Sequence, residues 1–286
     1  MILRYYLQKD LFLNSDLVKY CSDNCQENNR EQHSEECMMR LAKLHDKGLF
    51  TQPGSNYHGE CPICCLPLPL DPEKSTLMSC CCKVICNGCH FTNTKRDDIE
   101  GLEHRCAFCR EPLVKSQEEN YKNVMERVKK NDPTAISCMG KKHYHEGDYG
   151  KALEYMTKAA ELGDASAHFC LGCSYDKGTG VEKDMEKAVY HWEQAAIGGH
   201  PDARGRLAAH EVENDNFDRA ARHLMINANL GHDDSLKVIK DFFKAGLVSK
   251  EDYAAALRGF QAAVNETKSA EREGAGEFNT YKSIKA

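Results

Sequence analysis

Cysteines with metal-binding spacing are concentrated between residues 61 and 109. Three Cys-x-x-Cys pairs occur, at Cys61–Cys64, Cys86–Cys89 and Cys106–Cys109, and a fourth source of thiols is the run Cys80-Cys81-Cys82. A Cys-x-x-Cys turn lets two thiolates reach one metal ion, and four thiolates make a closed tetrahedral zinc site. The pattern therefore predicts two structural zinc ions, with at least one of Cys80, Cys81 and Cys82 not a ligand.

The main alternative for these cysteines is a set of disulfides or buried free thiols. The N-terminus shows no secretory signal, because charged residues interrupt it before an apolar core develops, so paired spacing favours metal. The stretch also has few large apolar residues, whereas a structural zinc contributes on the order of 10 kcal/mol of folding energy. We expect chelation of the metal to unfold residues 61–112.

The order of these cysteines resembles a RING finger. The opening Cys61-Pro-Ile-Cys64, the cluster leading into Ile85-Cys86 and the closing Cys-x-x-Cys-Arg match that family, as do gaps of 15 residues after Cys64 and 16 after Cys89. The resemblance implies crossed pairing, in which one zinc is bound by Cys61, Cys64, Cys86 and Cys89. The other would be bound by Cys81, by Cys80 or Cys82, and by Cys106 and Cys109.

The same resemblance implies an activity and two positioning residues. RING fingers that act as ubiquitin ligases form no covalent intermediate, and instead hold a ubiquitin-charged conjugating enzyme in a reactive pose. Ile63 stands where that family places an apolar contact to the conjugating enzyme. Arg110 stands where an arginine bonds both that enzyme and its ubiquitin, with a fork of donors that lysine cannot reproduce. As alternatives, Ile63 could belong to the core and Arg110 to the solvated surface.

Two positions depart from the RING pattern. Lys83 stands where many members have a histidine ligand, so the missing ligand must come from the three consecutive cysteines, and the sequence leaves open which of Cys80 and Cys82 joins Cys81. Ala107 replaces a proline common in members that bind a conjugating enzyme. These departures keep a non-enzymatic module open as the alternative.

A second metal pattern precedes the first, at Cys21, Cys25, His33 and Cys37. His33 and Cys37 are four residues apart, which places both on one face of a helix. The pattern resembles the second half of a MYND finger, a small zinc module, but the two Cys-x-x-Cys pairs of the first half are missing. Three explanations stay open: the four residues share one zinc, the finger has lost its metal, or the chain lacks its true N-terminus.

Self-similarity governs the second half of the chain. Ala135, Ala167, Ala203 and Ser235 recur at steps of 32, 36 and 32 residues, and small residues at fixed positions let neighbouring helices approach closely. The best unit runs from Ala167 through Gly172, Tyr175 and Trp192 to Gly199. It resembles the Sel-one-like repeat, a relative of the tetratricopeptide repeat, which implies a solenoid that binds a protein partner on its surface.

The predicted fold is mostly α: an α-solenoid of helix-pair repeats, preceded by a small zinc-stabilised α+β module and a partial MYND-like finger. The predicted segments are a MYND-like finger and helix (1–48), a linker (49–60), a RING-like zinc finger (61–113), a connector helix (114–132), Sel-one-like repeats (133–266) and a disordered tail (267–286).

Composition narrows the functional classes. The formal net charge of −6 lacks the basic footprint of a nucleic-acid-binding protein, and no apolar run approaches the ~20 residues of a membrane span. The leading hypothesis is an intracellular ubiquitin ligase, in the cytoplasm or nucleus, whose repeats recruit a substrate or partner and whose zinc module engages a ubiquitin-conjugating enzyme. The alternative is a zinc-binding scaffold without enzymatic activity.

Overall fold

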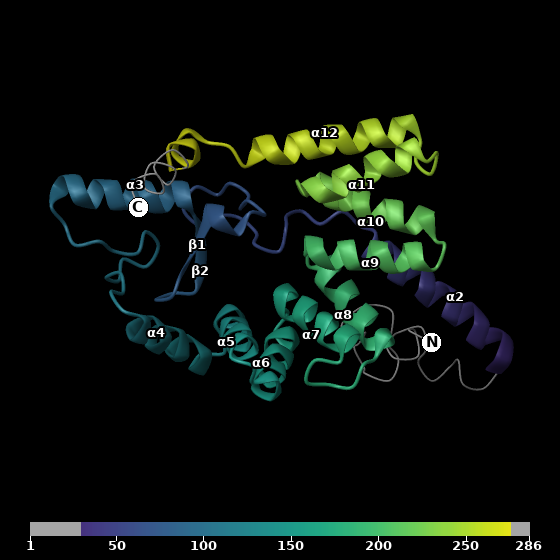
Figure 1. The fold of residues 1–286 in the computed structure, drawn as a ribbon, viewed down its shortest axis with the longest axis horizontal. Helices are drawn as coiled ribbons and strands as arrows, with labels where there is room; N and C mark the ends of the chain where they lie inside the picture. Colours follow the sequence, from purple (N-terminus) through teal and green to yellow (C-terminus); the bar gives the residue numbers. More distant parts are fainter. Residues whose placement is uncertain (1–29, 276–286) are drawn as a thin grey trace.

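The computed structural model describes residues 30–275, excluding the side chains of residues 30–38 and 41. The helix α2 (Arg30–Leu49) comes first, and a two-stranded sheet and helix α3 (Asn87–Glu100) follow. From there the described chain is a succession of helices (Figure 1). The prediction of a mostly helical chain with a helix-pair solenoid is confirmed. None of the described helices combines the length and apolar character needed to cross a membrane.

The cysteine-rich module is built on a β-hairpin and one helix. A 3-10 turn (Pro72–Lys74) leads into β1 (Ser75–Met78), which pairs antiparallel with β2 (Lys83–Cys86), with Ser75 opposite Cys86. Two short hairpin turns, closed by bridges between Glu60 and Pro67 and between Arg105 and Pro112, carry the flanking Cys-x-x-Cys pairs. The module has a small core, in which Leu68, Met78 and Ile85 pack among the cysteines.

The connector helix α4 (Gln117–Lys129) begins at a side-chain cap. The Ser116 hydroxyl accepts a hydrogen bond from the Glu119 amide, and the Glu119 carboxylate accepts one from the Lys115 amide, 3.0 Å away. This is a variant of the capping box. Val124 on α4 is buried against the first repeat, so the connector is part of the solenoid's packing.

Four helix pairs make the solenoid. Their small residues lie where neighbouring helices touch: Ala135, Ala167 and Ala203 are fully buried, and a side chain on Gly172 would collide with the Trp192 ring. Alanine and glycine at these places let the helices approach closely. The pairs are α5 (Pro133–His145) with α6 (Tyr149–Glu161), α7 (Ala165–Lys177) with α8 (Met185–Ile197), α9 (Pro201–Glu213) with α10 (Phe217–Asn229), and α11 (Asp233–Lys244) with α12 (Lys250–Glu266).

The solenoid follows an arc whose two ends approach the cysteine-rich module (Figure 1). At the first end, Cys82 of the module packs with Val124, Ala135 and Met139. At the other end, residues that follow α12 hydrogen-bond to the loop at residues 66–67. The module therefore bridges the beginning and the end of the solenoid.

The predicted linker is instead a packed segment. We call residues 49–58 the strap, because they lie against α8, α9 and α10. Leu49 is fully buried with Trp192 and Leu207, and its carbonyl oxygen accepts a hydrogen bond from the buried Arg204, 3.0 Å away. The composition Gln-Pro-Gly-Ser-Asn at residues 52–56 correctly predicts turns. It does not predict which helices those turns contact.

Further contacts continue along the strap and the helix before it. The Phe50 ring contacts the ring of His223 and the Arg222 guanidinium, at 4.6 and 3.7 Å. Tyr57 stacks on His200, and its amide donates to the carbonyl of Gly199. Asp46 on α2 forms an ion pair with Arg219 on α10, with both carboxylate oxygens 2.8 Å from Nη1. Specific contacts thus join residues that are more than 140 positions apart in the sequence.

The expected disordered tail is wrong for its described part. Residues 270–275 form a helical turn after α12. Arg272 in that turn donates hydrogen bonds to the carbonyl oxygens of Pro67 and Thr267, at 2.7 and 2.8 Å. The Lys-, Glu- and Gly-rich composition of this segment predicts disorder. Composition does not reveal that Arg272 has hydrogen-bond acceptors on the cysteine-rich module. Residues 276–286 lie outside the described part of the chain.

Candidate metal centres

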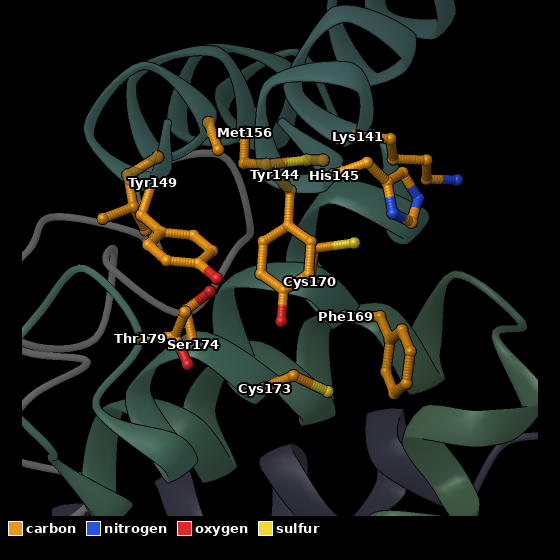
Figure 2. A pocket seen from close by; sticks show the side chains of 12 residues that line it. Lys141, Tyr144, His145, Tyr149, Met156, Phe169, Cys170, Cys173, Ser174 and Thr179 are labelled. Atoms are coloured by element: carbon orange, nitrogen blue, oxygen red, sulfur yellow. The ribbon is translucent and has the colours of Figure 1, made fainter. Parts of the chain in front are cut away.

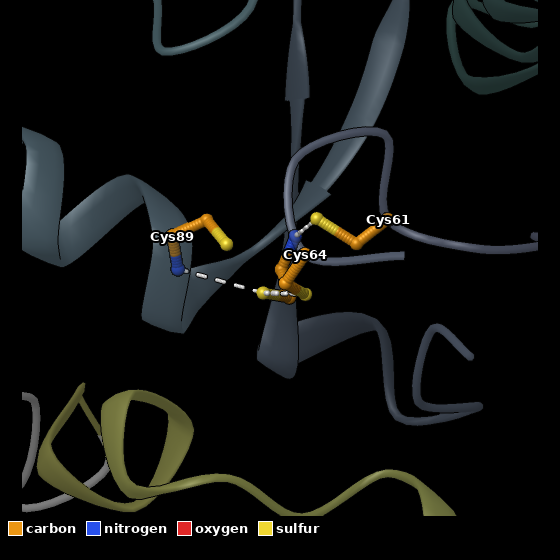
Figure 3. A group of neighbouring side chains, drawn as sticks. Cys61, Cys64 and Cys89 are labelled. Atoms are coloured by element: carbon orange, nitrogen blue, oxygen red, sulfur yellow. Dashed lines mark hydrogen bonds between the residues drawn. The ribbon is translucent and has the colours of Figure 1, made fainter. Parts of the chain in front are cut away.

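The first cysteine group consists of four thiols from two parts of the module. Its members come from the first hairpin turn and from the junction of β2 with α3. Figure 3 shows Cys61, Cys64 and Cys89 converging on one point, and the sulfur atoms of Cys64 and Cys86 are 3.8 Å apart. The sulfur atoms of all four members lie within 4.8 Å of one another: Cys61, Cys64, Cys86 and Cys89.

The second cysteine group lies at the other end of the module. Its members come from the loop between the two strands and from the last hairpin turn. The sulfur atoms of Cys81 and Cys106 are 3.9 Å apart, and those of Cys80 and Cys109 are 3.3 Å apart. The four sulfurs again lie within 4.8 Å of one another: Cys80, Cys81, Cys106 and Cys109.

These separations fit a shared metal ion. Zn–S bonds of ~2.3 Å in a tetrahedron put the sulfur atoms roughly 3.8 Å apart, whereas a disulfide needs about 2.05 Å. Backbone amides also point at the sulfurs: the amide of Cys86 donates to Cys61 Sγ, and those of Phe108 and Cys109 donate to Cys106 Sγ, at 3.4 to 3.5 Å. Such bonds stabilise thiolates. Both groups can therefore hold a metal ion.

Electrostatics favours a cation at the centre of each group. A hydrogen bond from the Cys86 thiol lowers the pKa of Cys61 to about 4, so one thiol of the first group ionises readily. Burial, followed by repulsion from Cys106 and Cys109, raises the pKa of Cys81 to about 11. Burial likewise raises the pKa of Cys89 to about 12. Without a cation, four crowded thiols cannot all ionise, while a divalent ion removes that cost.

The three consecutive cysteines separate into two roles. Cys80 and Cys81 point into the second cysteine group, whereas Cys82 has a positive φ of 52° that turns its side chain toward the first repeat. Burial raises the pKa of Cys82 to about 12, so it remains a neutral thiol in an apolar setting. The sequence could not choose between Cys80 and Cys82, because the choice depends on this single backbone angle.

The remaining predicted metal ligands are not placed by the structure. Cys21 and Cys25 lie outside the described residues. His33 and Cys37 fall on the backbone of α2, in the part whose side chains are not described. The third zinc site stays a prediction.

Ile63 and Arg110 line one open groove on the module. Both side chains are exposed, and the groove also contains Ala107, with Asn93 and Arg96 from α3. Arg110 Nη1 donates to the side-chain oxygen of Asn93, 2.8 Å away. The alternative reading of the sequence, in which Ile63 belongs to the core, is wrong, because Ile63 is exposed. Residues Ser269 and Glu271, from the segment after α12, form another part of the groove wall.

A second cavity lies within the repeats, between α5, α6 and α7. Figure 2 shows the rings of Tyr144, Tyr149 and Phe169 around it, with Lys141 and His145 along one edge. Its volume is about 290 Å³ and its lining is mainly apolar. No motif in the sequence marked this cavity, because its lining residues come from three helices of two different repeats.

Comparison with known proteins adds a family for part of the chain. Residues 128–164 and 165–200 match the family model described as Sel1 repeat. The mouse protein "DAP3-binding cell death enhancer 1" is 40% identical over 60 residues, which are 21% of this chain and 12% of that protein. The chain thus spans about an eighth of this relative, so the relative's activity does not transfer with the match.

Two solved structures match part of this chain. A Sel1 repeat protein from Oxalobacter formigenes is 26% identical, with a TM-score of 0.46 over 54% of this chain and 66% of that one. The protective antigen c5321 of uropathogenic Escherichia coli is 18% identical, with a TM-score of 0.42 over 67% of this chain and 40% of that one. The repeat assignment itself comes from the family match and from the helix pairs. This chain therefore contains Sel1 repeats, which occupy residues 128–200 at least.

Proposed function

We propose that residues 61–113 bind two zinc ions and act as a RING-type ubiquitin ligase module, while the Sel1 repeats recruit a protein partner. The carrying observation is the interleaving of the two cysteine groups. The first and third cysteine pairs in the chain form one group, and the second and fourth form the other. This interleaving puts the exposed Ile63 and Arg110 on one groove. The zinc ions would be structural, and they would supply no chemistry of their own.

The proposed catalysis is positioning. Ile63 would make the apolar contact with a ubiquitin-conjugating enzyme. Arg110 would donate hydrogen bonds to that enzyme and to its ubiquitin, and thereby hold the thioester in a reactive pose. Asn93 already accepts a bond from Arg110 and would orient its guanidinium. Ala107, with no proline ring, offers less contact area at this surface.

A self-ubiquitination assay tests the proposal. Purified zinc-loaded protein would be incubated with ubiquitin, activating enzyme, ATP and a panel of conjugating enzymes, beside Ile63→Ala and Arg110→Ala. Truncating an anchor worth about 1.4 kcal/mol should lower the initial rate about tenfold. Ile99→Ala is the matched control, because Ile99 is an exposed isoleucine of the same module and does not line the groove. It should retain the wild-type rate.

The alternative is a zinc-binding scaffold without ligase activity. It is favoured by one observation: Ser269 and Glu271, from the segment after α12, form part of the wall of the groove that a conjugating enzyme would need. Absence of ubiquitin chains with every conjugating enzyme, from protein shown to contain two zinc ions, would refute the ligase and leave the scaffold. Chains that form equally with all three variants would place the activity elsewhere.

Partner recruitment by the repeats is constrained by the strap. Sel1 repeats mediate protein–protein interactions, but here the strap covers surface of α8, α9 and α10. We therefore place the partner site at the cavity between α5 and α7. Its aromatic and thiol lining suits an apolar side chain, and Lys141 with His145 suits an acidic neighbour of that side chain.

The number of zinc ions bound per chain tests the N-terminal site. Three ions per chain would add the site at Cys21, Cys25, His33 and Cys37.

A further inference from the structure

The segment after α12 lies directly on the first cysteine group. Its backbone approaches the first turn of α3 so closely that a side chain on Gly88 would come within 2.7 Å of the Arg272 backbone nitrogen. In Figure 3 this segment is the yellow helix below Cys64 and Cys89. It is therefore packed against the same turn of α3 that carries Cys89.

Arg272 is the residue that holds the segment in place. Its Nη1 donates to the carbonyl oxygens of Pro67 and Thr267, and its Nη2 donates to that of Leu66, 3.3 Å away. Nη2 also lies 3.5 Å from the sulfur of Cys64. The planar fork thus bonds the backbone of the turn between Cys64 and Leu68 and one of the sulfur atoms as well.

The charge of this contact depends on the metal. Four thiolates around one divalent ion leave a net charge of about −2, and a guanidinium beside one sulfur offsets part of it. Partners that hydrogen-bond to metal ligands orient those ligands and strengthen metal binding. Without the metal nothing fixes the sulfur of Cys64 beside Arg272, which keeps its hydrogen bonds to carbonyl oxygens.

We propose that Arg272 is an outer partner of the zinc site at the first cysteine group, and that it couples zinc binding there to docking of residues 267–275. The inference rests on the proposed zinc site. Linkage makes the coupling reciprocal, so the docked segment strengthens zinc binding by the same factor by which zinc strengthens docking. The docked segment also brings Ser269 and Glu271 to the groove of Ile63 and Arg110, so zinc occupancy sets the shape of that surface.

A site-resolved zinc challenge tests this coupling. Zinc-loaded wild type, Arg272→Ala and Arg272→Lys would be exposed to a competing chelator and an alkylating reagent, and labelling of each cysteine would be followed by mass spectrometry. We expect zinc affinity of the first cysteine group to fall roughly 10- to 100-fold in Arg272→Ala. Labelling of the second cysteine group should be unchanged. Arg272→Lys keeps the charge without the fork and should give an intermediate loss.

Hydrogen exchange supplies the reciprocal measurement. In the wild-type protein, amides of residues 267–275 should exchange faster after zinc removal, and in Arg272→Ala they should exchange fast with zinc present. Arg258→Ala is the control, since Arg258 is an exposed arginine on α12, and it should match the wild type in both measurements.

The outcomes separate this inference from the proposed zinc site. Wild-type protein that binds no zinc overturns both. Protein that binds two zinc ions, with the same cysteine labelling in Arg272→Ala and wild type, overturns the coupling alone. Equal exchange of residues 267–275 with and without zinc also overturns it.

Discussion

Cys80 and Cys82 differ in the direction of their side chains, and this direction decides which of them can bind the metal. The two side chains are two positions apart, yet one faces the second cysteine group and the other faces the first repeat. The resemblance to RING fingers predicted that cysteines from this run would join Cys106 and Cys109, whereas spacing alone would allow other pairings. It could not predict which ones, because that depends on a positive φ at Cys82.

Serine substitutions separate these roles. We expect Cys80→Ser to lose the second zinc ion, since serine is a poor zinc ligand, and to lower the zinc content from two ions to one. Cys82→Ser should keep both ions and lose about 1 kcal/mol or more of stability, because a hydroxyl is buried among Val124 and Met139. Native mass spectrometry gives the zinc count. Two ions in Cys80→Ser would show that Cys80 is not a ligand.

The buried His223 makes the stability of the folded protein depend on pH, and the direction of this dependence follows from its pKa. Burial, followed by the charges of Arg204, Arg219 and Arg222, lowers the pKa of His223 to about 3. Below the unfolded-state pKa near 6.5, the unfolded chain takes up a proton that the folded chain refuses, so stability falls as the pH decreases toward 3. This cost is absent above pH 6.5, where both states are neutral.

The slope of stability with pH measures this residue. We expect urea unfolding of the wild type between pH 6.5 and 4.5 to show a steeper loss of stability than that of His223→Gln, by up to about 1.4 kcal/mol per pH unit. The variant's absolute stability will be lower, because its site is buried, but only the slope is compared. Equal slopes in the two proteins would contradict a neutral buried His223.

Among the elements, the helices were more predictable than the segments between them. The recurring small residues, the N-cap at Ser116 and the proline that begins α5, Pro133, specify helices through local rules, and the four pairs follow them. The strap and the residues after α12 were assigned by composition to a linker and a tail. Their partners lie well over a hundred residues away in sequence, and local composition contains no information about such contacts.

The strap's contribution can be measured at its anchor. Leu49→Ala should destabilise the protein by about 2–5 kcal/mol, because it leaves a cavity against Trp192 and Leu207. Leu44→Ala is the matched control, since Leu44 lies on the same helix and is partly exposed, and it should cost less than about 1 kcal/mol. Chemical unfolding gives both values. Equal effects of the two substitutions would mean that the strap is a loose linker after all.

For the whole molecule, the cysteine-rich module is a bridge as well as a domain. It contacts α4 and α5 through Cys82 and the segment after α12 through Arg272. The order of motifs along the sequence predicts a cysteine-rich module followed by a solenoid. It does not predict that the solenoid's arc returns to the module, because curvature accumulates from small rotations between successive repeats.

Chelation tests this bridge. Removing zinc should unfold residues 61–112 and also raise hydrogen exchange in α4, in the first turns of α5 and in residues 267–275, because each packs on the module. Helices α8, α9 and α10 should keep their protection, since the strap and their own core stabilise them. Exchange that rises within residues 61–112 alone would show that the module is tethered without a structural role.

The strap also sets an order of events during synthesis. A solenoid built from neighbouring contacts can fold unit by unit as it leaves the ribosome. Here Asp46 and Phe50 find Arg219 and Arg222 only after more than 160 further residues have been made. Leu49 stays exposed until α8 and α9 emerge, and Phe50 stays exposed until α10 does. Nascent chains that stop before residue 230 should therefore be the ones that chaperones retain, and completion of α10 should release them.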